Sequence, residues 1–168
     1  MILTHDRILK LIKKGKLKIE PYDESAVGPA SIDLTLAGQL RVFTKKREII
    51  DGGTDYKSVT TLIDIDPVKG FVLQPGDLAM GITVERVTLP TDIAAWINSR
   101  SSFARIGLMS HITAPFIMPG VSNKQVLEIY NAGPKPIRLM KGMKICQLVF
   151  QECRGDAKYT GVFKDQEL

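Results

Sequence analysis

Short apolar segments with a two-residue period, separated by turns rich in glycine and proline, make up most of this chain after its first 15 residues. Such alternation is typical of β-strands that bury one face, and turns such as QPGD, MPGVSN and NAGPKP separate the segments. Many short strands without intervening helices favour a closed or double-sheet all-β architecture over a βαβ repeat. The clearest strand segments are SIDLTL (31–36), FVLQPGD (71–77), LAMGITVERVTLP (78–90), QVLEIYN (125–131) and KICQLVF (144–150).

The sequence also predicts two short helices outside this β pattern. The first would begin after Thr4 as its N-cap, place Ile8 and Leu11 on one face, and end at Gly15. The second is the segment SSFARIG (101–107), which starts with serine and ends with glycine. It has the form of a brief helix with serine at its cap.

The length of 168 residues predicts a single domain over 1–168, in which the polar residues 153–168 form a C-terminal tail or lid. No apolar run approaches the roughly 20 residues that span a bilayer, so we expect no membrane association. The acidic Asp6 and the lack of a small-residue cleavage site argue against a signal peptide, which predicts a cytoplasmic protein. Cys146 and Cys153 lack the spacing of a metal clip, and we expect both to be reduced.

The net charge does not by itself identify a partner. The chain has 23 basic and 18 acidic residues, a formal charge of +5, and much of the excess lies in its lysine-rich N-terminal segment. Few aromatic residues accompany these lysines, and no zinc-finger, basic-region or base-stacking motif is present. We therefore expect a solvated basic face and no polymeric nucleic-acid partner.

The stretch RSSFAR (100–105) sets two arginines and two serines at a predicted helix start. Free backbone N–H groups there, with guanidinium donors from Arg100 and Arg105, would suit a phosphate chain. An ordinary capped helix with surface arginines is the alternative, and spacing alone slightly favours it. No GxxxxGK[ST] loop is present elsewhere in the chain to bind phosphate instead.

Glu128 shares a strand face with Val126 and Tyr130, because side chains alternate along QVLEIYN. It is either an outward-facing strand carboxylate, which is the commoner case, or one held in a partly apolar pocket and suited to moving protons. His5 and His111 are the only histidines and belong to no HxE or HExxH pattern, so we expect no zinc site.

Taken together, these segments resemble the dCTP deaminase family, which belongs to the trimeric dUTPase-like superfamily. The similarity covers most of the chain, and RSSFARIGL (100–108) and VLEIYN (126–131) are its most specific blocks. The resemblance implies a mainly β fold, a distorted jelly-roll or double-sheet β-barrel of the dUTPase-like type with a short N-terminal helix and one short internal helix. It also implies a homotrimer with active sites between subunits and a role in pyrimidine deoxynucleotide supply.

The implied reaction is hydrolytic deamination of dCTP to dUTP and ammonia. By the resemblance, Glu128 matches the proton shuttle, Ser101 and Arg105 steady the attacking water, and the backbone carbonyl of Ala114 orients it. Magnesium (Mg2+) would enter with the nucleotide triphosphate, no zinc would be needed, and dTTP would be an inhibitor. The implied substrate contacts are Arg100, Ser101, Ser102, Phe103, Ala104, Arg105, Met118, Val126, Leu127, Glu128 and Lys158.

The chain departs from the family pattern in its turn and its tail. The family has an Asp-Pro-Gly-aromatic-x-Gly turn where this chain has Met118, Val121 and Asn123, so the aspartate that accepts from the sugar hydroxyl in the family is missing. In the tail, Val162 cannot replace an amide donor. Two alternatives therefore stay open: a dUTP diphosphatase, alone or combined with deamination, against which Met118 speaks, and a non-catalytic nucleotide-binding protein.

Overall fold

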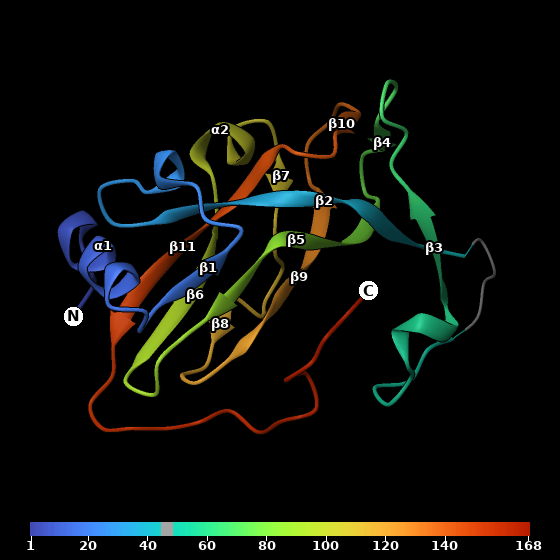
Figure 1. Ribbon diagram of the computed structural model, residues 1–168. Helices are drawn as coiled ribbons and strands as arrows, with labels where there is room; N and C mark the ends of the chain where they lie inside the picture. Colours follow the sequence, from blue (N-terminus) through green and yellow to red (C-terminus); the bar gives the residue numbers. More distant parts are fainter. Residues whose placement is uncertain (45–48) are drawn as a thin grey trace.

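The computed structural model describes residues 1–44 and 49–168 (Figure 1). Within these ranges the chain forms two α-helices, α1 (His5–Lys13) and α2 (Ser101–Ala104), and two 3-10 helices, η1 (Glu24–Ala26) and η2 (Tyr56–Ser58). The strands, in chain order, are β1 (Lys18–Glu20), β2 (Ile32–Phe43), β3 (Thr60–Asp64), β4 (Phe71–Leu73), β5 (Leu78–Thr88), β6 (Ile93–Ser99), β7 (Leu108–Met109), β8 (Phe116–Ile117), β9 (Ser122–Asn131), β10 (Ile137–Leu139) and β11 (Lys144–Glu152).

Antiparallel pairing joins most of the described strands into one nine-stranded sheet. Its path runs β7-β9-β5-β2-β11-β6-β8, with β1 added to β5 and β3 added to β2, while β4 and β10 form a separate pair. Figure 1 shows the long strands curling around a common interior, with α1 and α2 at the periphery. The predicted mainly β fold with one short N-terminal helix and one short internal helix is confirmed.

Strand β9 shows how side-chain alternation builds this sheet. Asn123, Gln125, Leu127 and Ile129 are buried on one face, and the residues between them are partly exposed. Leu127 and Ile129 are completely buried in the core, where burial of each such side chain stabilises the fold by roughly 1.5 to 3 kcal/mol. The opposite face of β9 is therefore free to contribute to a pocket.

Helix α1 forms where the sequence predicts it, except that Lys14 and not the predicted Gly15 holds the C-cap position. It buries Ile8 and Leu11, follows Thr4 at the N-cap position, and is followed by Gly15 with a φ of 66°. The Thr4 side chain makes no capping hydrogen bond, so the cap position rather than the cap contact is confirmed. No helix in the described ranges has the length and apolarity needed to cross a bilayer.

The predicted serine cap of the second helix is wrong. Arg100 holds the N-cap position of α2 with an extended backbone, and its carbonyl accepts hydrogen bonds from the N–H groups of Phe103 and Ala104. Ser101 is already helical. Strand β6 ends at Ser99, so only Arg100 remains for the change from extended to helical backbone.

Both cysteines are free thiols, in agreement with the prediction that they form no disulfide. Cys146 is completely buried in β11, and this burial raises the pKa of its thiol above the ordinary value, because desolvation penalises the thiolate. Cys146 is therefore a core side chain and not a nucleophile.

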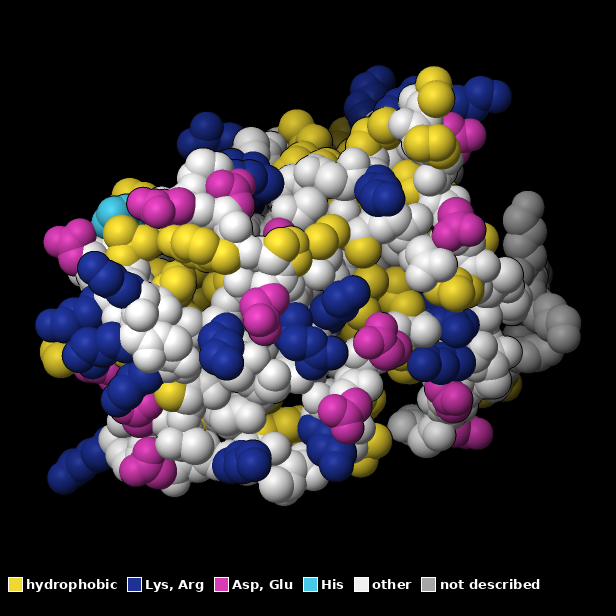
Figure 2. Space-filling model, viewed as in Figure 1, with side chains coloured by type: hydrophobic (Ala, Val, Ile, Leu, Met, Phe, Trp, Pro, Cys, Tyr) yellow, Lys and Arg dark blue, Asp and Glu magenta, His cyan; other side chains and the backbone are white. Residues whose placement is uncertain are grey.

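Charges of both signs cover the face of the molecule seen in Figure 2. Lysine and arginine side chains gather around the end that carries α1, and aspartates and glutamates lie between them. Helix α1 itself has Lys10 and Lys13 in its last turn, where cations interact favourably with the helix dipole.

Gly107 follows α2 at a point where backbone segments meet. Its φ is 89°, and a Cβ atom there would lie 2.4 Å from Cα of Gly133. We expect Gly107→Ala to lower the free energy of unfolding by about 3 kcal/mol, because left-handed strain and a backbone clash add. Gly15→Ala is the matched control, since its φ is 66° and nothing lies within 4 Å, and it should cost about 1 kcal/mol. Urea denaturation measures both, and equal losses would contradict this account.

Candidate active site

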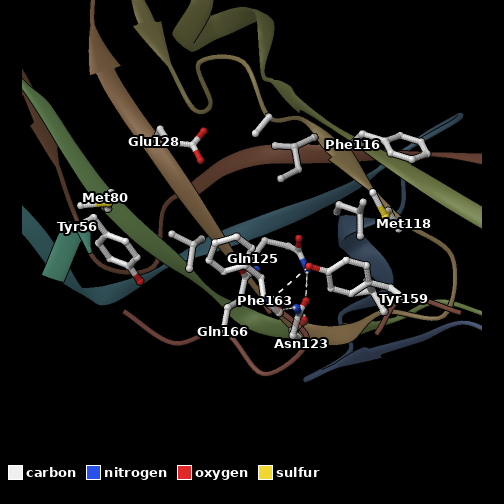
Figure 3. A pocket seen from close by; sticks show the side chains of 15 residues that line it. Tyr56, Met80, Phe116, Met118, Asn123, Gln125, Glu128, Tyr159, Phe163 and Gln166 are labelled. Atoms are coloured by element: carbon white, nitrogen blue, oxygen red, sulfur yellow. Dashed lines mark hydrogen bonds between the residues drawn. The ribbon is translucent and has the colours of Figure 1, made fainter. Parts of the chain in front are cut away.

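A pocket of about 360 Å³ lies between β9, the β8–β9 turn and the C-terminal tail (Figure 3). Met80 of β5 and Ile97 of β6 line it, together with Phe116 and Ile117 of β8. A concave site with apolar walls and few polar groups is the usual form of a small-molecule site. The polar side chains in this pocket therefore define what it can recognise.

Glu128 is the one carboxylate that lines this pocket among the described residues. It is half-buried on β9 beside Met80 of β5, and its face is the one predicted from side-chain alternation. The backbone N–H of Ile112 donates to Glu128 Oε2 over 3.3 Å, and Ala114 from the same loop also lines the pocket. The carboxylate of Glu128, which can accept a proton, thus lies in a partly apolar pocket beside the backbone of a loop.

Two buried amides lie on the floor of the pocket and were not identified as site residues from the sequence. Asn123 and Gln125 are each 4% exposed, and Gln125 Nε2 donates to Asn123 Oδ1 over 2.8 Å. A signal was present in the sequence, because both residues share the alternation phase of Leu127 and Ile129. Polar residues at core-facing strand positions need hydrogen-bond partners and are informative for that reason.

The C-terminal tail runs back under the sheet and lies along the pocket (Figures 1 and 3). Tyr159 N–H donates to the carbonyl of Pro119 over 3.0 Å, and Asn123 Nδ2 donates to the carbonyl of Phe163 over 2.8 Å. Gln166 Nε2 donates to a β9 carbonyl over 2.8 Å. The side chains of Tyr159, Phe163 and Gln166 consequently form one wall of the pocket.

The predicted phosphate-binding segment lies outside the Glu128 pocket of the same chain. The side chains of Ser101, Ser102 and Arg105 are exposed, and Arg105 instead borders a separate hollow with residues 133–138. Arg100 is turned to its own chain: its guanidinium lies 3.3 Å from Asp33 Oδ2 and donates to a β11 carbonyl over 3.2 Å. One chain therefore does not bring the serines and arginines together with Glu128.

Of the remaining predicted contact residues, some line the Glu128 pocket and others lie outside it. Met118 and Val126 line the pocket, and Met118 is 47% exposed. The side chain of Leu127 lies in the core, which leaves only its backbone for a ligand. Phe103, Ala104 and Lys158 do not line this pocket, and the exposed Lys158 lies over the turn at Gly120.

The described residues contain no group of three or more histidine, cysteine, aspartate or glutamate side chains placed to hold a metal ion.

Residues 2–153 match the family model described as dCTP deaminase-like. A Beutenbergia cavernae protein named "dCTP deaminase, dUMP-forming" is 40% identical over 151 residues, which cover 89% of this chain and 79% of that relative. A protein with the same name from Nocardioides sp. is 38% identical over 174 residues, which cover 99% of this chain and 91% of the relative.

Solved structures agree with this match. The 2'-deoxycytidine 5'-triphosphate deaminase from Agrobacterium tumefaciens superposes with a TM-score of 0.69 at 26% identity over 89% of this chain, which spans 46% of that protein's chain. The Staphylococcus bacteriophage 80alpha dUTPase superposes with a TM-score of 0.53 at 16% identity, over 88% of this chain and 97% of its own. The second likeness shows that the dUTPase-like fold is shared.

Gly120 connects the β8–β9 turn to the tail. Its φ is 73°, and a Cβ atom there would lie 2.9 Å from Cα of Lys158. We expect Gly120→Ala to loosen the tail and to raise the rate of tryptic cleavage after Lys158 about tenfold, equivalent to about 1.4 kcal/mol of docking free energy. Gly142→Ala is the control, because its φ is 87° but nothing lies within 4 Å, so strain arises without tail contact. The same cleavage rate in both variants would argue against docking at this turn.

Proposed function

Because the chain belongs to the dCTP deaminase-like family, we propose that it hydrolyses dCTP to dUMP, ammonia and pyrophosphate. The observation that carries the proposal is the carboxylate of Glu128 in a small apolar pocket beside the loop that contains Ala114. The names of the curated relatives specify dUMP, and they favour this product over the dUTP implied by the sequence resemblance.

The deamination step needs one water and a group that moves protons. Water attacks C4 of cytosine, and Glu128 accepts one of its protons and passes it to the departing amino group, while the second proton of the water ends on N3 of the ring. The C4–N bond breaks, a C4 carbonyl and an N3–H form, and ammonia leaves. The N–H of Ile112 occupies Glu128 Oε2, so Oε1 is available to the water. The carbonyl of Ala114, in the loop beside it, would orient that water.

We place each complete active site between two subunits of a homotrimer. Ser101, Ser102 and Arg105 are exposed and lie outside the Glu128 pocket of their own chain, so a neighbouring copy would have to supply them. Arginines and a helix start supplied in this way would bind the triphosphate and steady the water. Magnesium would enter on the triphosphate, where it screens phosphate charge.

Formation of dUMP requires a second water, which attacks the α-phosphorus and releases pyrophosphate. Met118 offers no carboxylate to activate this water, and this residue favours the alternative of a deaminase that stops at dUTP. The two functions share the deamination step and differ only in what happens to the phosphates.

Product analysis distinguishes these functions. Purified protein with magnesium and dCTP should release ammonia and pyrophosphate in equal amounts, with dUMP as the nucleotide product, and the same protein should be tested separately with CTP, dUTP and dTTP. Ammonia without pyrophosphate would establish the dUTP-forming alternative. The absence of any product from all four nucleotides would contradict an enzymatic role and favour a nucleotide-binding protein.

Replacement of Glu128 by glutamine tests the proton shuttle. The amide keeps the shape of the side chain and can still accept from Ile112, but it cannot carry the proton. We expect ammonia release from dCTP to fall by about 10² or more while dCTP still binds, measured by single-turnover kinetics and calorimetry. Equal rates for the variant and the parent would remove Glu128 from the mechanism.

A further inference from the structure

We propose that the side-chain oxygen of Gln125 accepts a hydrogen bond from the sugar hydroxyl of the bound nucleotide, and that Asn123 and the tail position it. This inference rests on the proposed function, because it assumes that a deoxynucleotide occupies the pocket. It adds a specificity-determining residue and two positioning groups to that function.

A chain of three hydrogen-bonding groups leads from the tail to the pocket. The carbonyl of Phe163 accepts from Asn123 Nδ2 over 2.8 Å. Asn123 Oδ1 accepts from Gln125 Nε2 over 2.8 Å, and the Asn123 backbone carbonyl lies 3.4 Å from the same nitrogen. Figure 3 shows Gln125, Asn123 and Phe163 grouped at this edge of the pocket, with the Gln125 oxygen turned away from Asn123.

The direction of this chain fixes the orientation of both amides. A backbone carbonyl only accepts, so Asn123 must present Nδ2 to Phe163 and Oδ1 to Gln125. Gln125 then faces two acceptors and must present Nε2 to them. Its Oε1 is left as the end of the chain, and it makes no hydrogen bond among the described residues.

Other polar groups of the pocket already have partners in the tail or in the loops. The hydroxyl of Tyr159 lies 3.3 Å from the N–H of Phe163, and the hydroxyl of Tyr56 donates to a carbonyl of the tail over 3.1 Å. The amide nitrogen of Gln166 donates a hydrogen bond to the carbonyl of Lys124 in β9. Gln125 Oε1, Gln166 Oε1 and the Glu128 carboxylate therefore remain as side-chain acceptors for a ligand among these lining residues. Two of these acceptors belong to β9, Gln125 Oε1 and the Glu128 carboxylate, and Gln125 is the most buried of the three residues.

The two acceptors suit different parts of one nucleotide. Glu128 has to lie at C4 of the base to move its proton, so the base occupies that end of the pocket. The sugar then lies nearer the tail and the floor, where Met118 and Val121 offer only apolar contacts. A sugar hydroxyl is a donor, and a buried acceptor of fixed direction discriminates strongly against a ligand that lacks one.

The test compares dCTP with 2',3'-dideoxy-CTP, which lacks the 3'-hydroxyl, in the parent and in Gln125→Met. For the parent we expect kcat/KM to be roughly tenfold higher with dCTP. Gln125→Met keeps the length of the side chain and removes the acceptor, so the preference should fall to about twofold or less, mainly through a loss on dCTP. Gln151→Met is the matched control: Gln151 lies in β11 and accepts from Trp96 Nε1 outside the pocket, so the preference should stay at the parent value.

Asn123→Ala tests the positioning role. It releases the Gln125 amide from its partner, so the preference for dCTP should fall, and adding Gln125→Met should lower it no further. An additional fall in the double variant would contradict action through Gln125.

The outcomes separate the inference from the proposed function. If the parent and Gln125→Met turn over both nucleotides with the same preference, the inference is overturned while the proposed function stands. If the parent neither binds nor turns over dCTP, the proposed function fails and the inference fails with it.

Discussion

Side-chain alternation along β9 is the constraint on which both the core and the candidate site depend. Leu127 and Ile129 face the core, and the same phase places Asn123 and Gln125 on the pocket floor. Glu128 projects from the other face and meets the loop at Ile112. A shift of one residue in the pairing with β5 would bury the carboxylate and expose the leucine, so packing of the core holds the site in register.

The tail joins this arrangement through backbone groups more than through its own side-chain chemistry. The carbonyl of Phe163 binds Asn123, and the N–H of Tyr159 binds the turn at Pro119. Val162 is 92% exposed and is not one of the residues that line the pocket, so the departure of the tail from the family pattern at this residue does not change the pocket wall. The hydrogen bond between Asn123 and the Phe163 carbonyl thereby links docking of the tail to the polar side chains on the pocket floor.

The fold could be predicted to a large extent because it follows from local pattern. Alternation in SIDLTL, QVLEIYN and KICQLVF located β2, β9 and β11, and a 3.6-residue period located α1. The serine cap of α2 could not be predicted, because the end of β6 at Ser99 decides which residue makes the transition.

The candidate site was predictable only in its parts. Glu128, Ala114 and Met118 line one pocket, whereas Ser101 and Arg105 lie outside it, and no pattern in one sequence shows that these two groups are apart within a single chain. The amides at the pocket floor were recognisable by their phase on β9, but their orientation depends on a carbonyl 40 residues away in the sequence.

A crystal structure of the Glu128→Gln variant with dCTP and magnesium tests the central claim most directly, because the cytosine base would keep its amino group. The account predicts cytosine C4 beside the side chain at position 128, the sugar against Gln125, and the triphosphate at α2 of a neighbouring subunit. A nucleotide bound instead in the hollow between Arg105 and residues 133–138, or a triphosphate held by residues of one chain alone, would contradict it.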